Sequence, residues 1–373
     1  MTALEELMEL SREPYNPLVK DWKEKGGKVI GFVCSYVPEE ILHAAGLLPF
    51  RITPTGCTTT LEADAYFSRI NCTFCRACLQ MALEGKFGFL DGLVGINPCD
   101  HIRRLWDLWR LKAGLPFMKI LSLPHRVHEG AVEWYKGEIQ IFKGEVEKAF
   151  DTQINEDSLG KSIEIFNTSR EWIRKLYDLR TKENPPLSGN EVTRIIVALL
   201  HIPREEGNKL LERLLNELEN RKGISDYRAR LMVAGGACDD PEFIEVIEKA
   251  GGLVVTDSLC FGSRYFFERV KTDDDLLRSL SMAYLNRPFC AGMAGGERNR
   301  LNFNLEMAQR FSVNGIVFQK IRWCDLWGGE AFYLGEKLKE LGIPYLSLER
   351  EYWLSGQEQM KTRVQAFLEM IGK

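Results

Sequence analysis

Short apolar runs alternate with helix-period stretches at both ends of this 373-residue chain, and this alternation restricts the possible folds more than any other feature. The apolar or β-branched runs, which we expect to be buried strands, lie at 28–33, 47–52, 90–96, 117–121, 230–234, 253–256, 315–318 and 345–348. Strands that alternate with helices are typical of parallel sheets covered by helices on their faces.

The middle of the chain follows a different pattern. Between 129 and 223 the helix-period stretches follow one another without an intervening strand, at 129–151, 157–180, 188–200 and 203–221. The sequence therefore predicts an α/β protein with two doubly wound, Rossmann- or flavodoxin-like parallel-sheet domains, at 1–128 and 224–373. A helical connecting segment, 129–223, is expected to join them.

Charge and hydropathy exclude several classes of function. The chain carries 49 basic and 53 acidic side chains, a net charge of −4. It therefore lacks the excess of basic residues that is typical of nucleic-acid-binding proteins. No run of about 18 apolar residues predicts a membrane span, and the N-terminus has no apolar core of a signal peptide. We therefore expect a cytoplasmic protein that binds neither nucleic acid nor membrane.

Two segments resemble nucleotide-binding motifs, but both motifs are incomplete. Gly160-Lys161-Ser162 lacks the glycine five residues earlier that a phosphate loop requires, because that position is Asn155. The glycines at 235 and 236 follow a predicted strand, but the next residues break the dinucleotide pattern. The chain is not expected to hydrolyse a nucleotide itself.

The cysteines carry the strongest chemical signal. Ten cysteines in a chain expected to be cytoplasmic predict free thiols rather than disulfides, and soft thiolates bind iron–sulfur clusters or zinc. Cys72, Cys75 and Cys78 are spaced by three residues, and four further cysteines lie close to the ends of predicted strands, where parallel sheets gather ligands. These four are Cys34, Cys99, Cys238 and Cys324.

Some cysteines have simpler explanations. Cys57, Cys260 and Cys290 are interpreted as core residues, since a free cysteine packs as a small hydrophobe. A ferredoxin-type run would need a cysteine at position 82, which is alanine, and a helix over 72–84 would leave Cys78 on another face. Zinc is a weaker alternative because no second closely spaced pair exists. Among the histidines, His101 is the candidate catalytic residue because it follows Cys99 and Asp100.

Several separated segments resemble one known family, in the same order along nearly the whole chain. They are 35–40, 43–46, Cys72 with Cys78, 90–92, Cys99-Asp100, Cys324-Asp325, 342–344 and 362–367. In these segments the chain is similar to the 2-hydroxyacyl-CoA dehydratases and class I benzoyl-CoA reductases, and its length suits the smaller of their two homologous subunits.

The resemblance implies a cofactor, partners and a substrate class. It implies a 4Fe-4S cluster held by Cys72, Cys99 and Cys324, with one iron left open. It also implies a homologous larger subunit in a heterodimer or heterotetramer, and a separate ATP-hydrolysing iron–sulfur activator. The substrate would be an acyl-CoA thioester. A dehydratase eliminates water from it through a ketyl radical, whereas a benzoyl-CoA reductase adds electrons and protons to the aromatic ring.

The stretches 348–352 and 359–363 are more similar to the ring-reducing branch. Four alternatives stay open. The chain could be a 2-hydroxyacyl-CoA dehydratase subunit, or a homodimeric reductase in which Cys34, Cys75 and Cys78 support an 8Fe-9S double-cubane cluster. It could also be a non-catalytic scaffold subunit, zinc-bound or metal-free, or an acyl-CoA-binding protein without redox activity.

Overall fold

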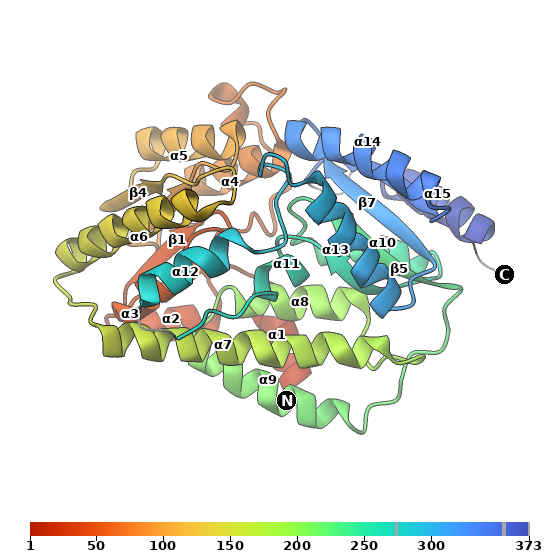
Figure 1. Cartoon of the computed structure of the whole chain (residues 1–373), viewed down its shortest axis with the longest axis horizontal. Helices are drawn as coiled ribbons and strands as arrows, with labels where there is room; N and C mark the ends of the chain where they lie inside the picture. The colour runs from red at the N-terminus through yellow and green to blue at the C-terminus, as the bar shows by residue number, and fades with distance from the viewer. Residues whose placement is uncertain (273–274, 353–355, 372–373) are drawn as a thin grey trace.

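The computed structural model describes residues 1–272, 275–352 and 356–371, which contain two four-stranded parallel sheets. The first has the order β2-β1-β3-β4 and the second the order β6-β5-β7-β8, so both follow the same connectivity (Figure 1). The predicted α/β class with two parallel sheets is confirmed. The strands are β1 (Val29–Phe32), β2 (Leu48–Arg51), β3 (Gly92–Ile96), β4 (Phe117–Leu121), β5 (Ala229–Gly235), β6 (Gly252–Ser258), β7 (Gly315–Ile321) and β8 (Tyr345–Arg350).

The helices before and around the first sheet begin at the caps that the sequence provides. Thr2 forms a capping box with Glu5, and the Asn16 side chain accepts hydrogen bonds from two backbone amides of the following helix, which starts with Pro17. The helices are α1 (Ala3–Leu10), α2 (Pro17–Glu24), α3 (Glu39–Ala44), the 3₁₀ turn η1 (Ala63–Ala65), α4 (Thr73–Leu83) and α5 (Asp100–Lys112).

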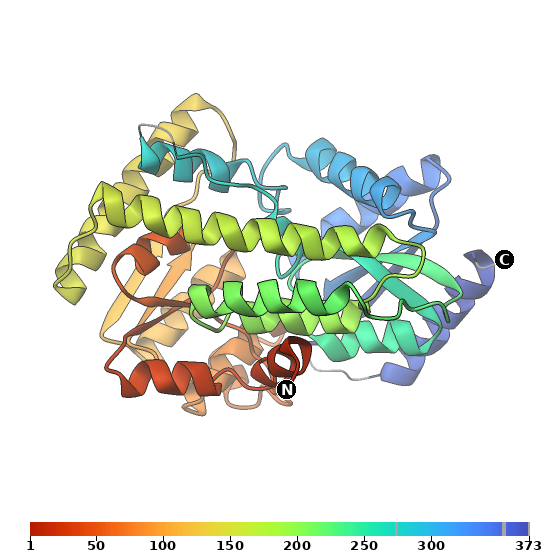
Figure 2. The same cartoon turned by 90° about the horizontal axis from the view of Figure 1, so that it is seen from below.

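The middle of the chain is helical, as predicted, and it contacts both sheets. It consists of α6 (Glu129–Phe150), α7 (Glu156–Asp178), η2 (Leu179–Thr181), α8 (Gly189–Leu199) and α9 (Arg204–Leu218). Helix α7 runs beneath both halves of the molecule (Figures 1 and 2). The backbone amide of Arg51 donates to the carbonyl of Leu200 at 3.0 Å, and the Arg180 guanidinium donates to the carbonyl of Val254 at 2.6 Å. The predicted domain boundaries at 128 and 223 stay a prediction.

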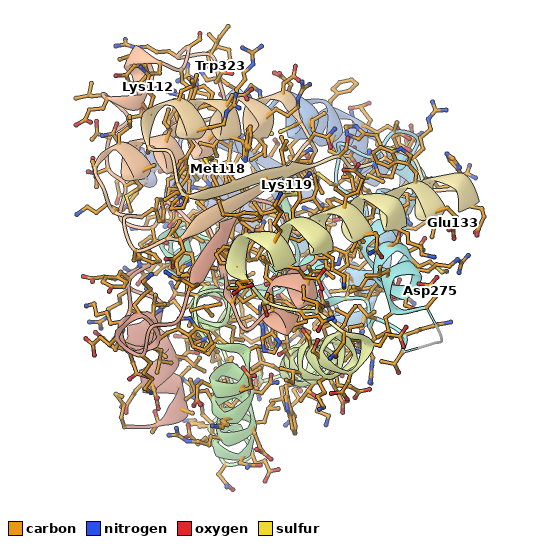
Figure 3. All side chains as sticks on the ribbon, turned by 90° about the vertical axis from the view of Figure 1, so that its left-hand side faces the viewer. Lys112, Met118, Lys119, Glu133, Asp275 and Trp323 are labelled. Carbon is orange, nitrogen blue, oxygen red and sulfur yellow. The ribbon has the colours of Figure 1, made fainter. Side chains whose placement is uncertain are left out.

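Helix α6 covers the outer edge of the first sheet. It lies across β4, and Lys119 of that strand pairs with Glu145 of α6 at 2.9 Å (Figure 3). An uncovered edge strand would present unpaired backbone groups to other chains, so this cover protects the sheet from edge-to-edge association.

The second half contains α10 (Pro241–Lys249), α11 (Ser263–Phe266), α12 (Leu276–Leu285), α13 (Glu297–Arg310), α14 (Asp325–Glu340) and α15 (Gln357–Ile371). Two predicted helix starts were wrong. Helix α5 begins at Asp100 rather than at Ile102, and α14 begins at Asp325 rather than at Ala331. The two glycines at 328 and 329 weaken the helical pattern of the sequence, but the surrounding structure keeps them helical.

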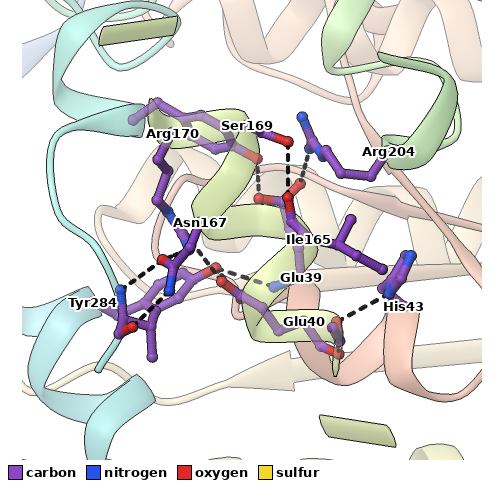
Figure 4. Close-up of polar contacts among 12 residues, drawn as sticks. Glu39, Glu40, His43, Ile165, Asn167, Ser169, Arg170, Arg204 and Tyr284 are labelled. Atoms are coloured by element: carbon purple, nitrogen blue, oxygen red, sulfur yellow. Dashed lines mark hydrogen bonds and ion pairs between the residues drawn. The ribbon is translucent and has the colours of Figure 1, made fainter. Parts of the chain in front are cut away.

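Two consecutive buried glutamates tie α3 to the helical segment. Glu40 pairs with Arg170 of α7 at 2.5 Å and accepts a hydrogen bond from Tyr284 of α12 at 2.7 Å (Figure 4). Glu39 pairs with Arg204 of α9 at 3.1 Å. Burial acts to raise the pKa of Glu40, but Arg170 and its hydrogen bonds outweigh it, so the pKa of this carboxyl is lowered.

In the described part of the chain, every helix is too short or too polar to cross a lipid bilayer.

Candidate functional site

A cavity of about 100 Å³ lies where the carboxyl ends of the two sheets meet, and seven of the ten cysteines line it. On one side Cys34 follows β1 and Cys99 follows β3. On the other side Cys260 follows β6 and Cys324 follows β7. The remaining three thiols of the cavity belong to Cys72, Cys75 and Cys290. Loops beyond the carboxyl ends of parallel strands commonly form binding sites, and here two sheets contribute them to one site.

The three cysteines predicted as cluster ligands line this cavity together. Cys72, Cys99 and Cys324 are far apart in the sequence, yet each is the N-cap residue of a helix, of α4, α5 and α14 respectively. The positive ends of three helix dipoles therefore meet at the cavity, where they favour negative charge. None of the three side chains makes a capping hydrogen bond to its helix, although all three residues line the cavity.

Cys99 and Cys324 occupy equivalent places in the two halves. Each follows the third strand of its half, β3 or β7, which pairs with the first strand, and each is followed by an aspartate. The residue before Cys324, Trp323, has a left-handed backbone with φ of +64°, which is rare for a bulky residue. The chain thereby turns so that Cys324 lines the cavity while Trp323 lies at the outer surface (Figure 3).

The three thiols act on one another's pKa. The pKa of Cys324 is raised by its hydrogen bond with Cys72 and then by burial. Burial is the largest cause of the raised pKa of Cys99, and the thiols of Cys72 and Cys324 add to it. For Cys72 the contact with Cys324 lowers the pKa, but Cys75 and burial outweigh that contact and the net shift is upward. Each of the three is thus an electrostatic neighbour of the others.

A second group of thiols completes the cavity wall. Burial raises the pKa of Cys34 to about 12, and Cys290 and Cys260 act in the same direction, while Arg51 opposes them. Cys290 also raises the pKa of Cys99, so it connects the two groups. Cys260 and Cys290, interpreted as core residues, are half-buried and pack against the core, and they also line the cavity. Cys260 lies two residues after β6, a strand-end position that the sequence could have indicated, whereas Cys290 lies between α12 and α13, where no strand end or spacing pattern marks it.

The other three cysteines lie outside the cavity lining. Cys57, Cys78 and Cys238 are buried in the hydrophobic core, as predicted for Cys57. Cys75 lines the cavity and Cys78 does not, in agreement with the helical spacing of α4. Cys238 follows the end of β5, as predicted, but it does not line this cavity. The supporting role of Cys78 in a larger cluster stays a prediction.

His101 links the three cysteine-bearing segments at the cavity wall. Its Nδ1 lies 2.9 Å from the side-chain oxygen of Asn71, which precedes Cys72. Its Nε2 lies 3.3 Å from a carboxylate oxygen of Asp325, which follows Cys324. His101 itself is two residues after Cys99. Both ring nitrogens therefore have partners, and the predicted catalytic role stays a prediction.

The donor set indicates what kind of group the cavity suits. Among the described residues, no three Cys, His, Asp or Glu side chains are arranged around a single metal ion. A structural zinc ion needs four ligands that meet about 2.3 Å from one centre. The thiolates of an iron–sulfur cluster bind different iron atoms, so thiols spread around a small cavity fit a cluster better. The cavity is also far smaller than the roughly 300–1,000 Å³ of ordinary small-molecule pockets.

The fold and the cavity define a class: a two-sheet α/β protein with a buried site built from thiols of both halves. The family described as 2-hydroxyglutaryl-CoA dehydratase, D-component, matches residues 34–371. This chain therefore belongs to the family of 2-hydroxyacyl-CoA dehydratase and benzoyl-CoA reductase subunits. The resemblance drawn from the separated cysteine segments is confirmed.

Named relatives come from both branches of this family. The chain is 27% identical to a benzoyl-CoA reductase subunit of Thauera aromatica over 88% of each chain. It is 23% identical to the (R)-phenyllactyl-CoA dehydratase beta subunit of Clostridium sporogenes over 97% of each chain. It is 21% identical to the beta subunit of (R)-2-hydroxyglutaryl-CoA dehydratase of Acidaminococcus fermentans over 99% of this chain and 98% of the relative. All three relatives are named as enzyme subunits.

Proposed function

We propose that this chain is the iron–sulfur subunit of an enzyme that reduces a CoA thioester by one electron. The convergence of Cys72, Cys99 and Cys324 on one cavity carries the proposal, because packing alone gives no reason for three remote cysteines to share a wall. These three residues would hold a 4Fe-4S cluster. Such a cluster supplies electrons at potentials down to about −700 mV, and a thioester requires a very low potential.

The chain itself contributes the electrostatics and the exclusion of water. Three helix N-termini favour the negative charge of thiolates, and the buried cavity keeps solvent from the site. Both features, with hydrogen bonds to the sulfurs, tune the potential of a bound cluster. The small volume leaves no space for an acyl-CoA, so we place the substrate beyond this cavity, toward a homologous larger subunit.

We further propose that the substrate is an aromatic acyl-CoA, as the name benzoyl-CoA reductase indicates for the relative of Thauera aromatica. The similarity to that relative and the stretches 348–352 and 359–363 support this choice. Dehydration of a 2-hydroxyacyl-CoA is the alternative, supported by the similarity to dehydratase beta subunits. A separate ATP-hydrolysing activator would deliver the electron, because this chain has no phosphate loop.

The experiment that tests this function is an anaerobic assay. The protein, purified without air together with its candidate partner subunit, is mixed with an activator, ATP and a panel of acyl-CoA thioesters. Ring reduction of benzoyl-CoA supports the first choice, and loss of water from a 2-hydroxyacyl-CoA supports the second. Protein that is colourless, free of iron and unaffected by air would contradict both and favour a scaffold subunit.

The second group of thiols favours a larger cluster as an alternative cofactor. Cys34, Cys260 and Cys290 face the same cavity and would supply three more ligands, enough for a double-cubane cluster in a homodimeric reductase. Iron and sulfide analysis separates the two cases, with about four irons per chain for one cubane and about eight for two. We expect Cys290→Ser to leave the iron content unchanged if the chain holds one cubane, and to lower it if the chain holds two.

We propose His101 as a positioning residue that holds the three ligand segments together through Asn71 and Asp325. Loss of an outer-shell partner typically costs about 10–100-fold in metal affinity. His101→Ala should therefore release iron to a chelator at least about 10-fold faster than the wild type. His43→Ala is the control, because His43 bonds to Ser162 and Glu205 outside the cavity. Equal release rates for the two variants would contradict this role.

A further inference from the structure

Arg51 is a buried cation at the wall of the thiol cavity. It ends strand β2, its side chain is 2% exposed, and it lines the cavity beside the cysteines. Within the described residues, its Nε and Nη1 atoms have no hydrogen-bond partner. Buried polar groups in folded proteins are nearly always hydrogen-bonded, and a buried charge without compensation is expensive. The position of Arg51 therefore requires an explanation.

Aromatic rings account for part of the environment of this guanidinium. Its central carbon lies 4.4 Å from the centre of the Phe261 ring, 5.5 Å from that of Phe32 and 5.6 Å from that of Tyr265. Cation–π contacts stabilise the flat faces of a guanidinium. The N–H groups lie in the plane of the group and point along its edge, so the rings do not satisfy them. The Nε and Nη1 donors of this cavity-lining residue are therefore still without an acceptor.

The second group of thiols, Cys34, Cys260 and Cys290, lines the same cavity as Arg51. Burial is the largest effect on Cys34 and Cys260, and the pKa of both thiols is raised. Arg51 acts in the opposite direction on both thiols. Arg264, the other arginine near Cys260, already donates to the carbonyls of Ser258, Phe289 and Gly235. Among the described residues that line the cavity, Arg51 is therefore the arginine with unpaired donors, and it also acts to lower the pKa of the buried Asp239, which burial raises.

We propose that Arg51 balances the negative charge of the thiolate-bound group in the cavity and thereby raises its reduction potential, an inference that rests on the proposed function. Each thiolate ligand adds a negative charge, and reduction adds one more, in a cavity that is shielded from water. A fixed positive charge with free N–H donors offsets this charge, and hydrogen bonds to sulfur act in the same direction. Without Arg51 the group would be harder to reduce.

The test is a redox titration of the anaerobically purified protein, followed by electron paramagnetic resonance, with iron analysis of each sample. We expect Arg51→Gln to keep its iron and to bind the added electron at least about 10-fold more weakly. A 10-fold change corresponds to about 59 mV for a one-electron couple. Arg51→Lys, which retains the charge, should stay close to the wild type.

Arg180→Gln is the matched control. Arg180 is 1% exposed and also has two guanidinium nitrogens without partners, Nε and Nη1, but it does not line the cavity. Its loss should leave the potential unchanged. If Arg51→Gln fails to load iron and Arg51→Lys loads it, the role of the charge is supported. Loss of iron in both Arg51 variants, with Arg180→Gln fully loaded, would refute a charge role.

Two further outcomes distinguish failure of this inference from failure of the proposed function. An iron-loaded Arg51→Gln with the wild-type potential would refute this inference and leave the proposed function standing. Wild-type protein without iron would refute the proposed function and this inference together.

Discussion

Replacing Cys99 or Cys324 with serine is expected to remove most of the iron from this protein. Each of these residues is the N-cap of a helix that starts at the cavity, and the two follow strands of different sheets, so each variant removes one of the proposed ligands from one half. Loss of an outer-shell partner already costs about 10–100-fold in metal affinity, and loss of a ligand should cost at least as much. Anaerobic iron and sulfide analysis, with visible absorbance, measures the effect.

Cys57→Ser is the matched control for these variants. Cys57 is buried outside the cavity, and its thiol donates to the carbonyl of Thr59 at 3.0 Å, a bond that a serine hydroxyl can replace. It should retain the iron content and colour of the wild type. If Cys99→Ser and Cys324→Ser kept full iron content, the ligand assignment would be wrong even if a cluster were present.

The second large effect is expected in the buried ion pair between Glu40 and Arg170. The two side chains are 0% and 3% exposed, and their charged atoms lie 2.5 Å apart. Removal of one partner of a buried pair leaves an uncompensated charge and typically costs about 3–5 kcal/mol. We expect Arg170→Met to lower the free energy of unfolding by this amount, since Glu40 would remain buried with Tyr284 as its main partner. Urea denaturation of the anaerobically purified protein, followed by tryptophan fluorescence, measures it.

Two further variants make this test specific. The double variant Glu40→Gln with Arg170→Met should be more stable than Arg170→Met alone, because it removes the buried charge as well. Asp157→Asn breaks the exposed pair with Lys161, whose side chains are 73% and 72% exposed, and should change stability by less than about 1 kcal/mol. An Arg170→Met variant as stable as Asp157→Asn would show that the buried pair contributes nothing.

The sequence predicted the fold class because it leaves a local pattern, whereas the set of Cys72, Cys99 and Cys324 came from the family resemblance. Alternating apolar runs and helix-period stretches predict parallel sheets, and the carboxyl ends of strands mark where Cys99 and Cys324 lie. The start of α14 was missed because the two glycines obscure the helical pattern and because Trp323 adopts a left-handed turn that no propensity indicates.

The rest of the site depends on contacts between segments that are distant along the chain. Cys260, Cys290 and Arg51 have no spacing pattern, and only the fold brings the ends of β2 and β6 and the α12–α13 connection to one cavity. Glu39 and Glu40 look like ordinary acidic residues in a first helical turn. Their burial is visible only once Arg204 and Arg170, more than a hundred residues away, are seen to pair with them.

The sharing of one cavity by two sheets has a consequence for how the protein tolerates oxygen. A group bound to thiols of both halves acts as a cross-link between segments more than 200 residues apart, and anything that binds the folded state alone adds to its stability. At 100 times the dissociation constant the gain is about 2.7 kcal/mol. If the proposed cluster is bound there, its oxidative loss would therefore weaken the junction between the halves and lower the free energy of unfolding.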